Sequence, residues 1–334
     1  MQKPTIADVA RNAKVSKATV SRVLNDVASV DPSLRKRVTS AIKKLNYQPS
    51  RAARTLKKNL LDVIGFLVPS ITDTIFGAVL QGAEDFAYQN KMGIIAYSTA
   101  DSLERQKMYL ENLQSEQLAG LILVPAPNTD LAFLLSIQSK GIPIVLFDRK
   151  IEGFQGDHIA SDNFQGAFMA VEHLIDNGYK RIATIAGSQN VSSGIERLNG
   201  YREALTSKGL ELDQELIKFG NFDEHESYKA TKALLSQATK PDAVFVANDS
   251  MTIGALHALK DLGINIPNQL AVVGFDEQPL ANLLHPTLTT IEQEATALGH
   301  EALRIFLDRI QNPDRPNRTV LMPTKLNIRE SSRS

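Results

Sequence analysis

The chain has 334 residues, 43% of them hydrophobic, and equal numbers of basic and acidic side chains, 37 of each. This length and apolar content suit two or three globular domains, and the absence of cysteine excludes disulfides, thiolate metal sites and thiol nucleophiles. No secretory segment and no apolar run long enough to span a bilayer occurs, so we expect a cytoplasmic protein with no membrane partner.

The equal totals hide an uneven distribution of charge. Residues 1–60 contain fourteen Lys and Arg against three acids, a net charge of +11, and the remaining residues carry −11. A basic head on an acidic body predicts a small module that binds a polyanion and a larger domain with a separate role. DNA is the expected polyanion.

Three short helices are predicted in the head. Thr5 and Asp8 form a capping-box pattern before a first helix, and Ser16 is placed to cap a second. Asp31 followed by Pro32 opens a third. The break between the first two helices is only three residues long, a spacing typical of a helix-turn-helix. Apolar residues at helical spacing indicate a shared core: Ile6, Val9, Ala10, Val20, Val23, Leu24, Leu34, Val38, Ile42 and Leu45.

The outward face of the second helix suits the major groove of DNA. Arg22 can pair with guanine edges, and Lys17 and Asn25 can contact bases or phosphates. Ala18 is small enough to touch a thymine methyl group. The alternative is a solvated polar face, which the absence of glutamate from this helix disfavours.

The head resembles the lactose-repressor (LacI/GalR) family of bacterial transcription regulators. The resemblance rests on Thr-Ile-Ala-Asp-Val-Ala at 5–10, Val-Ser-Lys-Ala-Thr-Val-Ser-Arg-Val-Leu-Asn at 15–25 and Leu-Asn-Tyr-Gln-Pro-Ser-Arg-Ala-Ala-Arg-Thr-Leu at 45–56. It implies a regulator that binds double-stranded operator DNA as a homodimer. The candidate DNA-contacting residues are Thr5, Ser16, Lys17, Ala18, Thr19, Ser21, Arg22, Asn25, Tyr47, Arg51, Ala53, Arg54 and Leu56.

Residues 49–60 are predicted to form a hinge helix and linker. Ser50 can cap a segment in which Ala52, Ala53 and Leu56 make a narrow apolar edge, although so short a helix is marginal in water. The resemblance implies that two such helices pair in the minor groove, where Leu56 wedges between base steps. The alternative is an interdomain linker with an incidental leucine.

From Asp62 onward, short apolar runs alternate with longer amphipathic segments. Repeated βα units of this kind imply parallel sheets, and two doubly wound lobes fit better than one very wide sheet. Strands are predicted at 63–68, 93–97, 120–124, 143–147, 158–161, 181–186, 243–247, 270–275 and 324–328, with helices near 74–90, 102–116 and 130–140.

The predicted architecture is therefore an α-helical helix-turn-helix domain followed by an α/β domain of two doubly wound parallel-sheet lobes, similar to periplasmic binding proteins. The expected domains are 1–48 for DNA binding, 49–60 for the hinge and 61–334 for effector binding and dimerisation. Within the last, one lobe takes about 61–160 and 292–322, and the other takes about 161–291 and 323–334.

Ligands of open α/β sheets bind beyond the carboxyl ends of the strands. Polar residues stand at such positions here: Asp148, Asp162, Asn248, Asp249 and Asp276. Each can instead be the N-cap of the following helix, and for Asp249 that interpretation is favoured.

The body resembles the sensor core of the same family. The matching motifs are Glu-Arg-Leu-Asn-Gly-Tyr at 196–201, Ala-Asn-Asp-Ser-Met-Thr-Ile-Gly-Ala at 247–255, Val-Val-Gly-Phe-Asp at 272–276 and Pro-Thr-Leu-Thr-Thr-Ile at 286–291. The resemblance implies that Asp162, Arg197, Asn248 and Asp276 hydrogen-bond the effector and that Phe76 and Phe222 pack on it. With Asp148, which follows a strand, these are the candidate effector-binding residues.

Carboxylates, an amide and an arginine around aromatic side chains suit a polyhydroxylated ring, because each buried hydroxyl needs a partner. A sugar or sugar derivative is therefore the expected small-molecule effector. A purine is disfavoured, since Val191 stands where purine-responsive members of the family carry an arginine.

An enzyme is the alternative from a different class. No G-x-G-x-x-G, G-x-x-x-x-G-K-[ST] or G-x-S-x-G motif occurs, and the six histidines lack metal-binding spacing. We predict a transcription regulator, a repressor under the control of a small effector, with no catalytic residue, metal or cofactor. Control by a phosphocarrier protein and a sugar-metabolising enzyme remain the alternatives.

Overall fold

The computed structural model describes residues 6–24, 30–45, 63–115, 118–277 and 281–333, with only the backbone of Ile6, Ser21, Leu24 and Ser115. The chain divides into two compact units, Met1–Leu61 and Asp62–Ser334. None of the described helices is long and apolar enough to cross a membrane.

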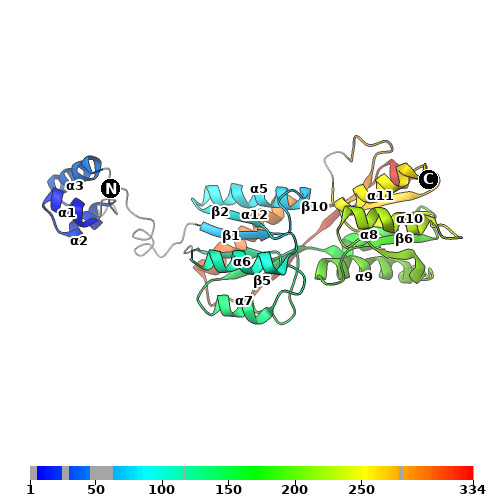
Figure 1. The fold of residues 1–334 in the computed structure, drawn as a ribbon, viewed down its shortest axis with the longest axis horizontal. Helices are drawn as coiled ribbons and strands as arrows, with labels where there is room; N and C mark the ends of the chain where they lie inside the picture. The colour runs from blue at the N-terminus through cyan, green and yellow to red at the C-terminus, as the bar shows by residue number, and fades with distance from the viewer. Residues whose placement is uncertain (1–5, 25–29, 46–62, 116–117, 278–280, 334) are drawn as a thin grey trace. The chain divides into compact units, whose positions relative to one another are not determined.

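Three helices make up the described part of the first unit: α1 (Ile6–Ala13), α2 (Lys17–Leu24) and α3 (Pro32–Lys44) (Figure 1). Ser16 Oγ accepts a hydrogen bond from the backbone N of Thr19 at 3.1 Å, so the predicted cap of α2 is confirmed. Asp31 likewise accepts from the backbone N of Ser33 at 2.8 Å and caps α3.

The core of the first unit is small and apolar. Val9, Val20 and Val38 are fully buried where the three helices meet. Leu34 was expected to face this core but is only half-buried, and Ala41 packs there instead. The inward stripe of α3 therefore starts one turn after its N-terminus.

The second unit contains two six-stranded sheets. The first sheet holds β1 (Val63–Val68), β2 (Gly93–Ser98), β3 (Gly120–Leu123), β4 (Ile144–Phe147), β5 (Asp157–Ser161) and β11 (Thr319–Met322). The second holds β6 (Ile182–Ala186), β7 (Ile217–Phe219), β8 (Ala243–Val246), β9 (Ala271–Phe275), β10 (Thr289–Gln293) and β12 (Thr324–Asn327).

Both sheets are doubly wound, as predicted. The strand orders are β11-β5-β4-β3-β1-β2 and β12-β10-β9-β8-β6-β7. Among the described strands, pairing is parallel except between β10 and β12, where Ile291 faces Leu326 in antiparallel register. The predicted strands are present, with ends that differ by at most one residue, but β7, β10 and β11 were missed.

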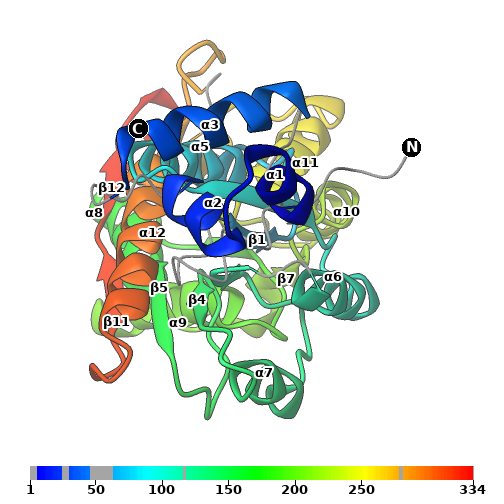
Figure 2. The same cartoon turned by 90° about the vertical axis from the view of Figure 1, so that its left-hand side faces the viewer.

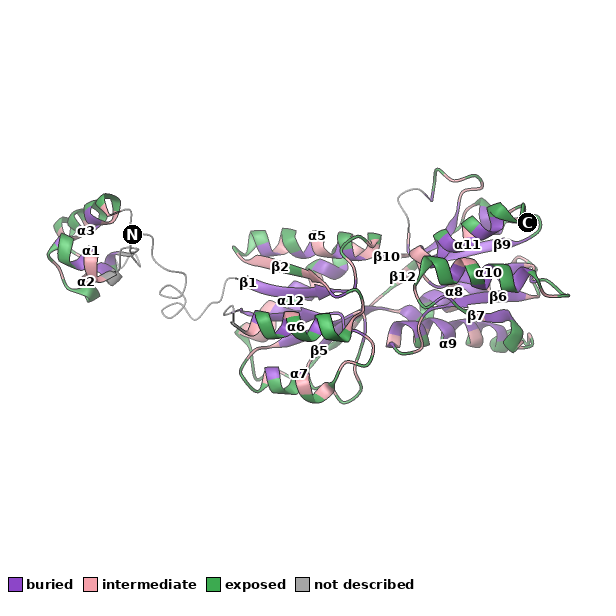
Figure 3. Cartoon of the chain, viewed as in Figure 1, coloured by how far each residue is buried: buried purple, intermediate pink, exposed green. Residues whose placement is uncertain are grey.

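Helices cover both faces of each sheet. They are α5 (Thr74–Gln89), α6 (Leu103–Ser115), α7 (Leu131–Gln138) and α12 (Ala295–Gln311) in the first lobe, and α8 (Asn163–Asp176), α9 (Ser192–Ser207), α10 (Glu224–Leu235) and α11 (Asp249–Asp261) in the second. In Figure 2, α6 and α7 lie on one side of the first lobe and α12 on the other. Figure 3 shows the central strands buried and the outward helix faces exposed, while β2, β11 and β12 are only partly buried.

The chain crosses between the lobes three times in the described residues. It leaves the first lobe after β5, returns after β10 to form α12 and β11, and crosses again to form β12. The first lobe therefore contains a helix and an edge strand from near the end of the chain.

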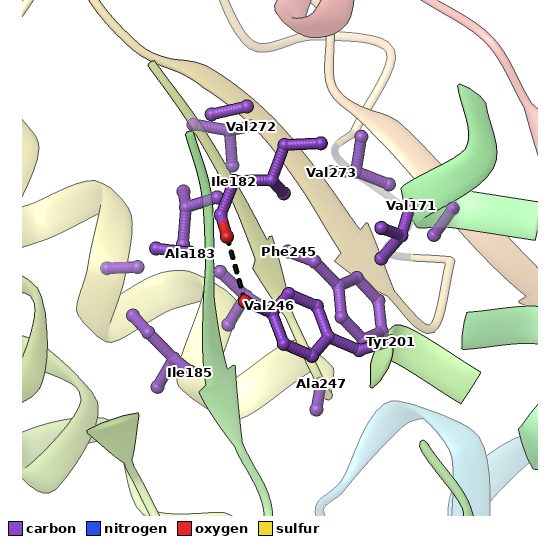
Figure 4. Packing of buried hydrophobic residues seen from close by; sticks show 14 of the residues in the cluster. Val171, Ile182, Ala183, Ile185, Tyr201, Phe245, Val246, Ala247, Val272 and Val273 are labelled. Carbon is purple, nitrogen blue, oxygen red and sulfur yellow. Dashed lines mark hydrogen bonds between the residues drawn. The ribbon is translucent and has the colours of Figure 1, made fainter. Parts of the chain in front are cut away.

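The second lobe has a continuous core around its central strands (Figure 4). Tyr201 on α9 is fully buried beside Phe245, and its hydroxyl donates to the backbone O of Ile182 at 2.8 Å. The only polar atom of this side chain is thus satisfied inside the core, which anchors α9 to β6.

Two glycines allow α5 and α12 to pack closely. A Cβ added at Gly82 would lie 2.0 Å from the backbone O of Thr296, and one at Gly299 would lie 1.9 Å from the backbone O of Val79. Both contacts are with backbone, which cannot move aside without shifting a helix.

We expect Gly82→Ala to lower the free energy of unfolding by about 1–3 kcal/mol, because the helices must separate. Gly77→Ala on the same helix is the matched control, since its added Cβ would meet nothing closer than the backbone O of Ile71 at 3.7 Å. This control should be neutral or stabilising by up to about 1 kcal/mol. Urea unfolding of the full chain measures both, and equal effects at the two positions would contradict the close packing.

Candidate functional site

The outward face of α2 is polar and basic. Lys17, Ala18 and Arg22 are exposed, and Thr19 is half-buried beside Ser16. The hydroxyls of Ser16 and Thr19 lie 2.9 Å apart at the start of the helix. The structure thus brings together the described candidate DNA contacts on one helix surface, opposite the apolar core.

The other candidate DNA contacts lie outside the described residues, and so does the proposed hinge helix at 49–60. They are Thr5, Asn25, Tyr47, Arg51, Ala53, Arg54, Leu56 and the side chain of Ser21. Their roles stay predictions.

Arg37 makes a contact that the sequence pattern did not suggest. Its Nη2 donates to the backbone O of Ala13 at 2.7 Å and of Lys14 at 2.9 Å. These bonds satisfy carbonyls at the end of α1 and join α3 to the turn before α2. Arg37 therefore holds the helix-turn-helix together.

A cavity lies between the two lobes of the second unit, with about 680 Å³ of empty volume including its open mouth. It opens at the carboxyl ends of strands of both sheets, where the topology of doubly wound sheets places ligands. Six of the seven candidate effector-binding residues line it: Phe76, Asp148, Arg197, Phe222, Asn248 and Asp276.

Asp162 is the exception. Its Oδ1 accepts a hydrogen bond from the backbone N of Gln165 at 2.9 Å, so it caps α8 and does not line the cavity. The preceding residue, Ser161, lines the cavity instead. Successive side chains of an extended strand point to opposite sides, which explains why only one of the two faces the ligand space.

Asp249 was expected to be a helix N-cap, but it lines the cavity. The N-cap of α11 is Asn248, whose Oδ1 accepts from the backbone N of Met251 at 2.9 Å. The favoured interpretation of Asp249 as an N-cap was therefore wrong. Asp249 is the first residue of the helix and lines the cavity, 5% exposed.

Arg197 is fixed in place by four groups of the second lobe. Its Nε donates to Asn163 Oδ1 at 2.8 Å, and its Nη1 donates to the backbone O of Ala247 at 2.6 Å. The guanidinium also lies 3.7 Å from the ring centre of Phe275, and Nη1 lies 3.8 Å from Asp276 Oδ2. Such an arginine is oriented before any ligand arrives.

Arg149, in the first lobe, is also held in place by hydrogen bonds to the protein. Its Nη1 and Nη2 atoms bind the two carboxylate oxygens of Asp101 at 2.5 and 3.0 Å, and Nη1 also donates to the backbone O of Pro125. Its Nε lies 3.7 Å from Asp148 Oδ2, too far for a hydrogen bond.

Several residues at the cavity adopt left-handed backbone conformations. The φ angles are 52° at Asp101, 60° at Asp148, 65° at Phe222 and 75° at Asp276. Such values are uncommon for residues other than glycine and cluster at functional sites. The strain here occurs where strands end and side chains must turn toward the cavity.

Burial raises the pKa of three carboxyl groups at the cavity. Desolvation raises the pKa of Asp276 to about 6, with Asp249 adding to the rise and Arg197 opposing it. Desolvation also raises the pKa of Asp148 and of Asp73, against the opposing charge of Arg149. The site therefore holds desolvated carboxylates that can accept hydrogen bonds from a ligand.

Besides Asp249, six polar residues of the lining were absent from the predicted set: Asp73, Asp101, Arg149, Ser161, Ser193 and Gln293. Gln293, at the end of β10, donates from Nε2 to Asp276 Oδ1. Arg149 directly follows a predicted strand and its aspartate, so its position was a usable signal. Asp73 and Asp101 lie several residues beyond the ends of β1 and β2, so the sequence pattern gave no signal that they line the cavity.

Two family models match the chain. Residues 5–50 match "Bacterial regulatory proteins, lacI family", and residues 171–332 match "Periplasmic binding protein-like domain". The transcriptional repressor PurR of Vibrio atlanticus (strain LGP32) is 33% identical over 318 residues, which cover 95% of each chain.

Solved structures of regulators have the same fold. The lac repressor dimer bound to operator and the anti-inducer ONPF superposes with a TM-score of 0.85 at 27% identity, covering 100% of both chains. The complex of the transcriptional regulator CelR with cellobiose gives 0.76 at 31% identity, covering 98% of this chain and 99% of that one. With its helix-turn-helix head and two-lobed body, the chain belongs to the lacI family of bacterial transcription regulators and is not an enzyme.

Proposed function

We propose that this regulator is a repressor whose affinity for operator DNA is controlled by a sugar or sugar derivative bound between the lobes. The observation that carries the proposal is the interlobe cavity, where charged and amide side chains from both sheets meet beside Phe76 and Phe222. A solved relative in complex with cellobiose supports this choice of ligand.

The hydrogen-bonding groups match a polyol. Asp148 and Asp276 offer carboxylate oxygens to ligand hydroxyls, while Arg197 and Asn248 carry donors. Because unpaired buried hydroxyls are costly, a ligand with hydroxyls at the right places gains both affinity and selectivity. The aromatic side chains supply apolar contact for the ring.

We further propose a homodimer in the cytoplasm that places two α2 helices on the half-sites of a near-palindromic operator. The lac repressor structure, a dimer on its operator, supports this arrangement. Ligand binding would change the closure of the lobes, and a coupling of about 1–3 kcal/mol between the ligand and DNA is enough for a graded response. Residues 49–60 would transmit the change.

The proposal is tested by DNA titration at fixed salt, using a duplex that the protein selects from a random-sequence pool. Thermal-shift screening against sugars, sugar phosphates and nucleosides identifies the ligand. A ligand that stabilises the protein should change its affinity for the duplex. If no compound stabilises the protein, control by a phosphocarrier protein becomes the better explanation.

Substitution of Arg22 tests the DNA-binding face. Arg22→Ala should weaken binding to the selected duplex by about 1–3 kcal/mol, with much less effect on random DNA, because a base contact is lost. Arg11→Ala removes the same charge from α1, where the side chain is 79% exposed. This control should weaken binding to both duplexes alike. Equal loss of selectivity in the two variants would exclude a base-reading role for Arg22.

The raised pKa of Asp276 predicts a pH-dependent affinity for the sugar. A hydroxyl that donates to this carboxylate favours its ionised form, so binding should strengthen as the pH rises through about 6. Calorimetric titration between about pH 5 and 8 measures this dependence, which can reach about tenfold per pH unit below the pKa. Asp276→Asn should bind more weakly with a flatter profile. A dissociation constant of the native protein that does not change with pH would contradict the contact.

A further inference from the structure

Carboxylates outnumber cations in the interlobe cavity. Five aspartates line it, Asp73, Asp101, Asp148, Asp249 and Asp276, and among the described lining residues the only cationic side chains are Arg149 and Arg197. The carboxylates come from both lobes, and burial of Asp249 and Asp276, each 5% exposed, removes the water that would screen their charges. The interior of the site is therefore unfavourable for a negatively charged ligand.

The two arginines are already engaged by the protein. Arg149 uses both Nη atoms on Asp101, and Arg197 uses Nε and Nη1 on Asn163 and Ala247. A phosphate or carboxylate ligand prefers a bidentate guanidinium. To bind either arginine in this way, the anionic ligand would have to break a hydrogen bond that the guanidinium already makes to the protein. Each of these bonds is 3.0 Å or shorter.

Two polar groups at the cavity have no hydrogen-bond partner in the described part of the chain. They are Ser161 Oγ, on a side chain only 1% exposed at the end of β5, and Arg149 Nε. A buried polar atom without a partner is destabilising, and a ligand atom can satisfy it. Hydroxyls are suited to this role, because a hydroxyl can accept a hydrogen bond from Arg149 Nε and can either donate to or accept from Ser161 Oγ.

We propose that the cavity selects an uncharged polyhydroxylated ligand over its phosphorylated or carboxylated derivatives, and that Ser161 is a specificity-determining contact for a ligand hydroxyl. This inference rests on the proposed function, because it concerns the same site. It deepens that proposal by excluding sugar phosphates and sugar acids as effectors.

Matched ligand pairs test the charge preference on the full-length protein. D-ribose is compared with ribose 5-phosphate, and D-glucose with glucose 6-phosphate and D-gluconate, with cellobiose as a larger neutral sugar. At least one neutral sugar should bind, and its charged derivative should bind about 100-fold more weakly or not at all, because like charges brought together are strongly unfavourable. Tighter binding of a charged derivative, or binding of no neutral sugar at millimolar concentration, would overturn the inference.

The same experiment separates the inference from the proposed function. If a sugar phosphate binds best and changes the affinity for the selected duplex, the repressor proposal stands and the charge preference fails. If a neutral sugar binds best without changing the affinity for DNA, the charge preference stands and the effector role fails.

Ser161→Ala tests the specific contact, with Thr324→Val as its matched control. Thr324 Oγ1 is also buried without a partner, but Thr324 does not line the cavity. Both variants should keep or slightly raise the unfolding temperature of the native protein, since each removes a buried polar atom that has no protein hydrogen bond. Ser161→Ala should weaken binding of the neutral sugar by about three- to tenfold, whereas Thr324→Val should leave it unchanged. An unchanged affinity in Ser161→Ala would rule out the contact.

Discussion

The organisation of the effector domain depends on Arg197. This buried guanidinium joins Asn163 at the start of α8, the carbonyl of Ala247 at the end of β8, and Asp276 after β9, while its face covers Phe275. A charge at this depth is tolerated because Nε and Nη1 are hydrogen-bonded, Asp276 lies close by and the ring of Phe275 covers one face of the guanidinium. The same bonds bring the ends of two neighbouring strands and a helix into one fixed surface, which the first lobe then faces.

Much of the fold follows from simple patterns in the sequence. Val63–Val68 and Ala271–Phe275 are uninterrupted apolar runs, as central parallel strands must be. The strands that were missed lack this signal: β7 has three residues, β10 reads Thr-Thr-Ile-Glu-Gln, and β11 has alternate residues exposed at a sheet edge. Pairing with neighbours, which is a tertiary effect, makes these segments strands.

The candidate site was predictable where polar residues directly follow a strand, as Asp148, Asn248 and Asp276 do. It was not predictable for Asp73 and Asp101, because loop conformations decide whether residues that far from a strand end reach the cavity. The choice between Ser161 and Asp162 depended on a strand register of one residue. Local sequence carries little information on such a register, since both residues are polar.

The late return of the chain to the first lobe has a consequence for synthesis. Residues 295–322 supply α12, which packs on α5, and β11, which completes the sheet edge beside β5. During translation, most of the first lobe is therefore synthesised before α12 and β11 are available to cover its apolar surface. A chain that ends before residue 295 lacks both elements, so we expect the first lobe to be completed only after the second lobe has been synthesised.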